Sequence, residues 1–486
     1  MKRGKREFRL IRRRNFLRTG QKSGFSGFWL ILLIVLLPLS GCENDNTELQ
    51  TIPSGEKIEQ YDVPFEQVPE TPDIAMYEVN TQVFSRSGNF KGIEGRLDSI
   101  KNLGINVIWL MPIYPVGVKK SVGSPYCVKD YTTVNSDYGT LDDLRELVKE
   151  AHRRNMAVIL DWVANHTSWD NDWIENKSWY TQDSSGNIMS PEGEGWSDVA
   201  DLNYSNTDMR KAMIQAMKYW VLTANVDGYR CDYAEGVPSD FWKQAIDTLR
   251  DIPNRKIIMF AEASDQTLYS AGFNLIFGWN YYSKLKSVFE DNTSANGLYA
   301  VNAADNTNLT SNSSILRFTS NHDYDSEATP ITVFNGFRGA QAAFVLTVCM
   351  GGVPLIYNGQ EIGCPVKLSF FNTATTKIDW SIHPDIRTEY KQLMALRNSN
   401  DAVKYGLVKS LGSNSDVIAF VREYAGSQVV VIVNVRNDAI DYQLPLFIEN
   451  SGWVNALTGK SINLADHINL KAYSYLILKN VISFDD

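Results

Sequence analysis

Three carboxylic acids each stand at the end of an apolar, strand-like run of this 486-residue chain. Asp232 ends the run 226–232, Glu262 follows the run 257–261, and Asp323 ends the run 315–323. In an α/β barrel the catalytic groups lie at the C-terminal ends of strands, so this placement predicts an active site. Two acids suffice to cleave a glycosidic bond with retention, one as nucleophile and the other as general acid and then base. The third acid would stabilise positive charge on the sugar ring.

The residues next to these acids predict different protonation states for Asp232 and Glu262. Arg230 lies two residues before Asp232, so both side chains point to one face of a strand. A guanidinium keeps a neighbouring carboxylate ionised, as a nucleophile requires, although a structural ion pair is the alternative for these two residues alone. Five apolar residues precede Glu262. Burial raises the pKa of a carboxyl group, which suits the proton donor.

Two of the five histidines lie beside such strand ends. His322 directly precedes Asp323, and His166 ends the segment 161–166, which opens with Asp161 after a further apolar strand. Neutral His or Asn side chains at a barrel mouth can hydrogen-bond sugar hydroxyls. A single histidine there would more often be structural, but the segments taken together favour a sugar-binding site.

Alternating strand-like and helical segments must position these residues. Besides the three runs above, the expected strands are 76–79, 107–110, 157–161, 353–357 and two weaker ones near Phe273 and Ile276. The expected helices are 93–102, 141–154, 208–223, 240–249 and about 340–350. Repeated βα units predict a parallel sheet, and about eight of them predict an α/β fold of the closed (β/α)8 TIM-barrel type.

Two parts of the chain break this rhythm. The segment between Asp161 and Asp208 includes Trp169, Trp173, Trp179 and Trp196 among Gly, Pro, Ser and Asn, and is too long for a loop without a function. After a helix over about 384–398, strands follow one another without helices. The expected domains are a catalytic barrel over 73–166 and 206–399, an inserted lid subdomain over 167–205, and a C-terminal antiparallel β-sandwich over 400–486.

The first 41 residues are typical of a secretion leader. They hold ten Lys or Arg and one Glu, with an apolar run at 28–39 that is short for a permanent membrane helix. Leu39-Ser-Gly-Cys42 resembles a bacterial lipobox, which implies cleavage before Cys42 and lipidation of its thiol. We therefore predict a lipoprotein signal peptide over 1–41 and a flexible tether over 42–72. The protein would be lipid-anchored in the bacterial cell envelope, at the outer membrane, on a periplasmic or a surface face.

The net charge restricts the classes of binding partner, and the cysteine positions indicate the state of the thiols. Without residues 1–41 the chain has 37 basic and 55 acidic residues, a net formal charge of −18. Binding of nucleic acid needs a basic surface, so no nucleic-acid partner is expected, whereas a neutral polymer is compatible. The other cysteines lack metal-like spacing, and we expect buried thiols rather than disulfides at Cys127, Cys231, Cys349 and Cys364.

Four motifs occur in a fixed order along the chain. They are DWVANH at 161–166, GYRCD at 228–232, Glu262 after its strand, and FTSNHD at 318–323. Further segments accompany them, namely YCVKDY at 126–131, DYGT at 137–140, DLN at 201–203 and GVPLIYNGQE at 352–361. Each motif alone is weak, but the ordered set resembles the α-amylase family of glycoside hydrolases, from about Ile74 to the C-terminus.

The resemblance implies a role for each matched residue. Asp232 resembles the nucleophile, Glu262 the acid/base, and Asp323 the acid that binds substrate hydroxyls and favours the transition state. Arg230 resembles the partner of the nucleophile. The other matched residues are implied to bind the sugar that is cleaved, by ring stacking at Tyr126 and by polar contacts at Asp161, His166 and His322.

The chain departs from the family three and four positions after the proposed nucleophile. Many α-amylases carry Lys-His there, but this chain has Glu235 and Gly236, which weakens the assignment to endo-hydrolysis of starch. The resemblance implies no required cofactor. It is compatible with a bound calcium ion, for which Asn165 and Asn203 are the candidate ligands. Calcium prefers several carboxylate and carbonyl oxygens, of which these residues supply only part.

These observations predict a retaining hydrolase of α-glucosidic bonds in starch-like glucans or maltooligosaccharides. The alternative is an α-glucosidase-like, neopullulanase-like or transglycosylating enzyme on short oligosaccharides, because the sequence does not show whether the insert forms a closed pocket or an open cleft. A surface glycan-binding protein without catalysis is the third alternative. The presence of all three acids and of Arg230 speaks against it.

Overall fold

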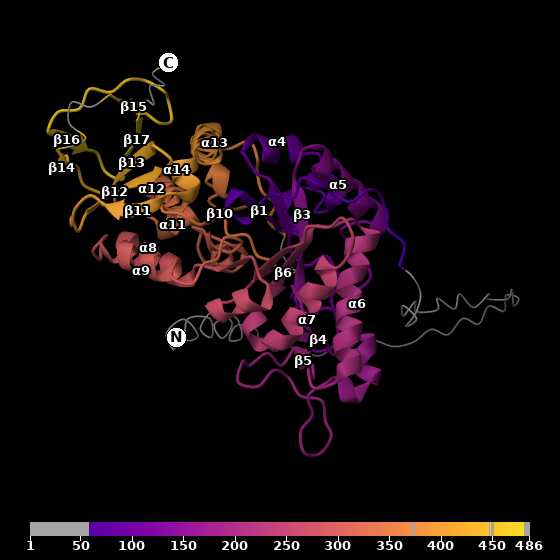
Figure 1. Ribbon diagram of the computed structural model, residues 1–486. Coiled ribbons are helices and arrows are strands. Elements are labelled where there is room, and N and C mark those ends of the chain that lie inside the picture. Colours follow the sequence, from indigo (N-terminus) through magenta and orange to yellow (C-terminus); the bar gives the residue numbers. More distant parts are fainter. Residues whose placement is uncertain (1–57, 372–374, 447, 449–451, 481–486) are drawn as a thin grey trace, which may run out of the picture. The chain divides into compact units, whose positions relative to one another are not determined.

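A computed structural model describes residues 58–371, 375–446, 448 and 452–480, so the predicted leader, Cys42 and the tether up to residue 57 lie outside the described residues. Eight parallel strands form a closed barrel in the order β1-β10-β9-β8-β7-β6-β3-β2 (Figure 1). They are β1 (Met76–Val79), β2 (Val107–Leu110), β3 (Ala157–Val163), β6 (Gly228–Asp232), β7 (Ile258–Ala261), β8 (Leu275–Phe277), β9 (Ser314–Arg317) and β10 (Val353–Tyr357). The predicted barrel is confirmed.

Helices connect these strands and cover the outside of the barrel (Figure 1). The α-helices are α2 (Thr81–Phe84), α3 (Phe90–Glu94), α4 (Leu97–Asn102), α5 (Leu141–Arg153), α6 (Thr207–Thr223), α7 (Ser239–Arg250), α8 (Trp279–Glu290), α9 (Gly297–Asp305), α10 (His322–Glu327), α11 (Pro330–Val333), α12 (Phe337–Cys349), α13 (Pro384–Ser399) and α14 (Asp401–Tyr405). Helix α5 shows why the sequence folds this way, because Thr140 and Asp143 form a capping box at its start. Its buried residues recur every three or four positions, at Leu144, Leu147, Val148 and Ala151.

The insert after β3 is framed by a small two-stranded sheet. Strand β4 (His166–Ser168) pairs antiparallel with β5 (Val199–Asp201), and the 3-10 turns η3 (Asp172–Glu175) and η4 (Lys177–Trp179) lie between them. Figure 1 shows this insert projecting from the barrel at the bottom of the view. Trp196 of the insert packs against the buried Cys127, so the insert is joined to the loop that follows β2.

The C-terminal part is built from antiparallel strands. A five-stranded sheet has the order β11-β12-β13-β17-β15, and β14 pairs with β16 in a second sheet. Apolar side chains of both sheets share one core, in which Tyr442 and Leu470 of the smaller sheet meet Ile432 and Leu478 of the larger. This is the expected antiparallel sandwich. The strands are β11 (Leu407–Ser410), β12 (Val417–Tyr424), β13 (Ser427–Asn434), β14 (Ile440–Gln443), β15 (Trp453–Asn455), β16 (His467–Leu470) and β17 (Tyr475–Asn480).

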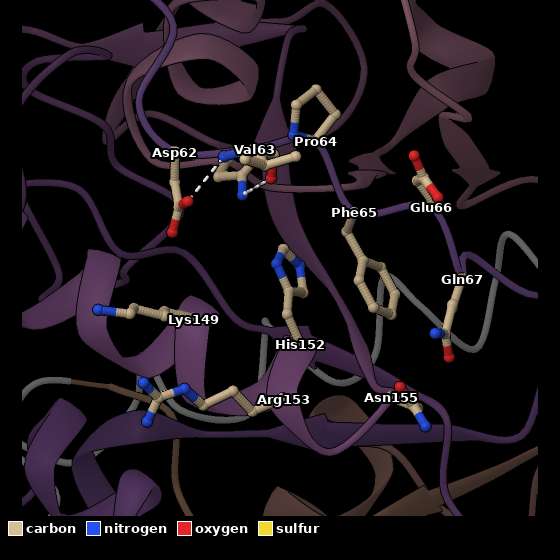
Figure 2. A pocket seen from close by; sticks show the side chains of 11 residues that line it. Asp62, Val63, Pro64, Phe65, Glu66, Gln67, Lys149, His152, Arg153 and Asn155 are labelled. Carbon is tan, nitrogen blue, oxygen red and sulfur yellow. Dashed lines mark hydrogen bonds between the residues drawn. The ribbon is translucent and has the colours of Figure 1, made fainter.

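Residues 60–68, called the strap below, fall within the predicted flexible tether but lie against the barrel. The side-chain amide of Asn225 donates to the carbonyl oxygen of Val63 (2.9 Å). The ring of Phe65 stacks on His152 of α5, with 4.3 Å between ring centroids. Figure 2 shows this pair at a pocket of about 390 Å³ between the strap and α5. The polar composition of the tether concealed these apolar and hydrogen-bonded anchors.

Several predicted boundaries shift in the structure. Strand β9 ends at Arg317, so Asp323 lies in the first turn of α10 and not in the strand. The two weak strands expected near Phe273 and Ile276 are one strand, β8, and the 3-10 turn η6 (Gln266–Ala271) stands where a helix would follow β7. The helix expected over 93–102 is divided into α3 and α4. No helix within the described residues is both long and apolar enough to cross a membrane.

Candidate active site

Arg230 joins three carboxyl groups at the C-terminal end of the barrel. Its Nη1 donates to Asp161 Oδ1 (2.8 Å) and to Asp232 Oδ1 (3.1 Å), and its Nη2 lies 2.8 Å from Glu262 Oε2. Arg230 and Asp232 come from β6, as their spacing predicted, while β3 supplies Asp161 and Glu262 directly follows β7. One guanidinium therefore fixes the two acids expected to do the chemistry side by side.

Asp161 is held by three neighbouring side chains beneath the paired acids. Its side chain is fully buried, with an exposed fraction of 0 %. Besides Arg230, it accepts hydrogen bonds from Trp109 Nε1 and from the hydroxyl of Tyr126, both at 3.1 Å. Burial raises the pKa of Asp161 to about 6, against the opposing effect of Arg230. Both oxygens of Asp161 thus contact protein groups in this structure, and the substrate contact at Asp161 stays a prediction.

Glu262 has the properties of a proton donor. Its carboxyl group keeps an exposed fraction of 10 %, so it can reach a ligand. The pKa of Glu262 is raised to about 7, mainly by burial and also by the carboxylates of Asp232 and Asp323, while Arg230 acts in the opposite direction. The backbone N–H of Tyr233 donates to Glu262 Oε2 (2.8 Å) and orients the group. The apolar run before Glu262 had predicted the direction of this shift.

Asp323 borders the same site through His322. The carboxyl group of Asp323 is exposed by 18 %, and its Oδ2 lies 3.6 Å from His322 Nε2. His322 is buried, and its Nδ1 lies 2.5 Å from an oxygen of Glu78 in β1. The ring of Tyr126 stacks on His322 with 5.4 Å between ring centroids.

Counting donors and acceptors assigns the charge of His322. Tyr126 has one hydroxyl proton and donates it to Asp161, so its oxygen accepts the second bond, at 2.7 Å, from His322 Nε2. Nδ1 donates to the Glu78 carboxylate. Both ring nitrogens are then protonated, which makes His322 an imidazolium. Burial lowers the pKa of His322, but the carboxylates of Asp323 and Glu78 outweigh it and raise the pKa to about 9.

His166 lies where the insert meets the barrel. It is buried and begins β4, its ring meets the edge of Trp196 at 5.6 Å between centroids, and its carbonyl oxygen accepts from the hydroxyl of Tyr131 (2.9 Å). Trp196 in turn packs edge-on against Tyr233, with 5.0 Å between ring centroids. His166 is thus connected through Trp196 to the residue that follows Asp232.

Sequence reasoning missed three residues of this site. Glu78 is a charged residue inside the otherwise apolar strand Met76–Val79, which was a usable signal because an unpartnered buried carboxylate is costly. Trp109 and Tyr233 gave no comparable signal. Their polar contacts to Asp161 and Glu262 depend on strands and loops that come together only when the barrel closes.

The candidate calcium ligands Asn165 and Asn203 already contact neighbouring protein groups, and the calcium site stays a prediction. The side-chain nitrogen of Asn165 lies 3.3 Å from His166 Nδ1, and the amide oxygen of Asn203 already accepts the backbone N–H of Ser205 (3.0 Å). Neither residue supplies a carboxylate, and calcium needs six to eight oxygens. Across the described ranges, no group of three or more His, Cys, Asp or Glu side chains is arranged to hold a metal ion. No step below is assigned to calcium.

Comparison with known proteins agrees with this geometry. The family model described as the alpha-amylase catalytic domain matches residues 44–188 and 194–381. The chain is 27 % identical to alpha-amylase 2 of Dictyoglomus thermophilum over 375 residues, which are 72 % of this chain and 64 % of that protein. It is also 27 % identical to a cyclomaltodextrin glucanotransferase of Niallia circulans over 403 residues, 71 % of this chain and 54 % of that protein. The chain thus spans 54 % to 64 % of the length of these two curated relatives.

A solved structure extends the likeness to the fold. The crystal structure of a maltogenic alpha-amylase, AmyB, from Thermotoga neapolitana superposes with a TM-score of 0.76 at 26 % sequence identity. The match covers 85 % of this chain and 100 % of that one.

Proposed function

The chain belongs to the α-amylase family, and from this membership we propose that it hydrolyses α-glucosidic bonds in starch-like glucans or maltooligosaccharides with retention of anomeric configuration. The observation that carries the proposal is the single guanidinium of Arg230, which holds Asp232 and Glu262 together at the open end of the barrel. A paired nucleophile and proton donor at this position are what retaining hydrolysis requires.

In the proposed mechanism Asp232 attacks the anomeric carbon while Glu262 protonates the leaving oxygen. Arg230 supports the ionised form of Asp232, and the raised pKa of Glu262 keeps its proton available near neutral pH. Glu262, now a carboxylate, takes a proton from water, which releases the sugar from Asp232. We expect the two carboxyl groups to lie roughly 5 to 5.5 Å apart, as in retaining enzymes.

The remaining residues are proposed to bind the sugar that is cleaved. Asp323 would accept hydrogen bonds from ring hydroxyls, and the positive charge of the His322 imidazolium beside it would balance the charge of the Asp323 carboxylate. His166 would contact the same sugar from the insert side. Tyr126 would offer the edge or face of its ring that His322 does not cover.

The test is the release of reducing sugar from soluble starch and maltooligosaccharides, with the anomer of the first product read by NMR. The proposal expects an α-anomer from the unmodified protein and none from the Asp232→Asn variant. A β-anomer would contradict the mechanism. Equal release by both proteins would show that Asp232 is not the nucleophile, and no release by the unmodified protein would favour a glycan-binding protein without catalysis.

A second candidate is action on short or cyclic oligosaccharides, by hydrolysis or by transfer to another sugar. The likeness to a cyclomaltodextrin glucanotransferase and to a maltogenic alpha-amylase supports it, as does the absence of Lys-His at Glu235 and Gly236. Product analysis on starch, pullulan, a cyclic dextrin and maltotriose decides between the candidates. Faster cleavage of the cyclic dextrin, or products longer than the substrate, would favour the second candidate.

We further propose that a lipid on Cys42 anchors the protein in the bacterial cell envelope. The support is the order of the basic stretch, the apolar run and Leu39-Ser-Gly-Cys42 in the sequence. The unmodified protein should partition with membranes, and a Cys42→Ala variant should not. Membrane partitioning by that variant would contradict the anchor.

A further inference from the structure

The turn that follows strand β6, residues 233–236, contacts the chain around Glu262 at three points, and Cys231 of β6 adds a fourth. The backbone N–H of Glu262 donates to the carbonyl oxygen of Cys231 just before the turn (2.9 Å), and the N–H of Ala234 donates to the carbonyl oxygen of Glu262 (3.1 Å). The N–H of Tyr233 reaches the Glu262 carboxyl group itself (2.8 Å). One oxygen of Glu235 completes the set by accepting from the loop after Glu262.

The contact of Glu235 is specific to two backbone groups. Its Oε1 accepts the N–H of Asp265 (2.9 Å) and also the N–H of Ser264. These N–H groups begin the turn that leads from β7 into η6, and they follow Glu262 by only two and three residues. A carboxylate that accepts two N–H groups of one loop fixes the direction in which that loop leaves the strand.

Tyr233 adopts a backbone conformation that few residues other than glycine take. Its φ of 43° and ψ of 48° are left-handed, which is strained for an aromatic residue. Its surroundings maintain this conformation, because its hydroxyl donates to Glu194 of the insert (2.9 Å) and its ring packs on Trp196. The conformation is what aims the Tyr233 N–H at Glu262.

The glycine at position 236 belongs to the same arrangement. A Cβ added there would lie 2.3 Å from the ring of Tyr233 and 2.7 Å from Asn165 Oδ1, so a larger residue would displace the ring. The unusual residues at 235 and 236 are therefore explained together, since Gly236 makes room for Tyr233 and Glu235 binds the neighbouring loop.

We propose that the turn 233–236 is a positioning element for Glu262, in which Tyr233 and Glu235 fix the proton donor from two sides and Glu194 links it to the insert. The inference rests on the proposed function, because it assigns a purpose to these contacts only if Glu262 is the general acid. Tyr233, Glu235 and Glu194 are positioning residues and need not touch the sugar.

The test compares two substrates that differ in their need for a proton donor. A maltooligosaccharide leaves as a poorly acidic alcohol and depends on Glu262, whereas α-maltosyl fluoride loses fluoride with little need for protonation. In the full chain, Glu235→Ala should lower kcat/KM on the maltooligosaccharide roughly 10-fold to 100-fold, the scale expected when a catalytic group is misplaced by about 1 Å. Its kcat/KM on the fluoride should change less than about threefold, because kcat/KM reports the steps up to the glycosyl-enzyme and the departure of fluoride needs little proton donation.

Matched variants separate positioning from general damage. Glu235→Gln keeps an oxygen that can accept both N–H groups and should restore most of the activity on the maltooligosaccharide. Glu194→Ala should repeat the selective loss to a smaller extent, and Glu194→Gln should not, because its amide oxygen can still accept from Tyr233.

The outcomes are distinct. A loss confined to the maltooligosaccharide and rescued by the Gln variants supports the inference. An equal loss on both substrates, or no loss in either Ala variant, overturns the inference and leaves the proposed function standing. An unmodified protein that cleaves neither substrate overturns the proposed function, and the inference falls with it.

Discussion

Two histidine–carboxylate pairs lie at opposite ends of the barrel. At the C-terminal end His322 Nδ1 contacts Glu78 at 2.5 Å, and at the N-terminal end His152 Nε2 contacts Asp227 at 2.8 Å. Asp227 directly precedes β6, and the oxygen that contacts His152 also accepts the N–H of Val158 in β3 (2.7 Å). Both pairs are largely shielded from water and similar in geometry, yet their surroundings differ.

The N-terminal pair is enclosed by structural groups. The ring of Phe65 covers His152 (Figure 2), and the contacts of Asp227 tie α5 to the starts of two strands. The C-terminal pair instead continues into a network of titratable groups, from His322 through Tyr126 and Asp161 to Arg230. The comparison teaches that the pair itself does not mark function. A functional site is indicated instead by the cluster of further titratable groups that lies beyond the second ring nitrogen of the histidine.

The largest expected effect comes from removing an acid of the C-terminal network. Asp232→Asn and Glu262→Gln should each lower kcat/KM by about 10³-fold or more, because each removes a group that acts on the reacting atoms. The measurement is hydrolysis of maltooligosaccharides at a fixed pH. His152→Asn is the control at the N-terminal end and should stay within about threefold of the unmodified protein, a change too small for a lost catalytic group. A comparable loss in the control would remove the distinction between the two ends.

A smaller effect is expected from Glu78→Gln. The amide can still accept from His322 but no longer supports its positive charge, so the pKa of His322 should fall. We expect kcat/KM to drop roughly 10-fold, because exchanging a hydrogen bond between charged groups for a neutral acceptor costs about 1 to 1.5 kcal/mol. The measurement combines kinetics with an NMR titration of His322. Unchanged kinetics together with an unchanged titration would contradict the assignment of His322 as an imidazolium.

The pH dependence provides a third test. Glu262 must be protonated to act as general acid, and its pKa is raised to about 7, so it is protonated below this pH and loses its proton above it. The value of kcat/KM should therefore decline as the pH rises through about 7. At about pH 8 it should be about tenfold lower than on the acidic plateau. His152→Asn should leave this alkaline limb in place. An alkaline limb near the ordinary pKa of glutamic acid would contradict the role of Glu262.

The smallest effect is expected at the strap. Phe65→Ala removes the ring that stacks on His152 and should lower the free energy of unfolding by about 0.5 to 1.5 kcal/mol. Catalysis should be unaffected, because the strap lies at the end of the barrel away from Arg230. Thermal unfolding and starch hydrolysis measure the two quantities. A loss of activity without a loss of stability would show that the N-terminal end contributes to function.

Periodicity and motif order were sufficient to predict the barrel, the antiparallel C-terminal domain and the grouping of Asp232, Glu262 and Arg230. Such patterns are local, and each strand carries its own apolar run and terminal acid. The contact between Glu78 and His322 could not be predicted from the sequence. It joins residues 244 positions apart and forms only when β1 closes the barrel against β10. The same holds for Tyr233, whose N–H points at Glu262 only through a left-handed turn.

The hydrogen-bond partners of Asp161 were also hidden from the sequence. Its motif placed it at the barrel mouth, but its side chain turns inward, where Trp109, Tyr126 and Arg230 occupy both oxygens. Whether a strand-end acid faces a ligand or the interior depends on which neighbouring strands offer donors. That information arises from the closed barrel and not from the segment itself.

The most direct test of the account is to identify the residue that becomes covalently bound to the sugar. The protein is incubated with a 5-fluoro-α-glycosyl fluoride, which reacts quickly and hydrolyses slowly, then digested and analysed by mass spectrometry. The account predicts one added glycosyl group on the peptide that contains Asp232, at the position of Asp232. A glycosyl group on Glu262 or Asp323, or hydrolysis through an inverted product with no labelled peptide, would contradict it.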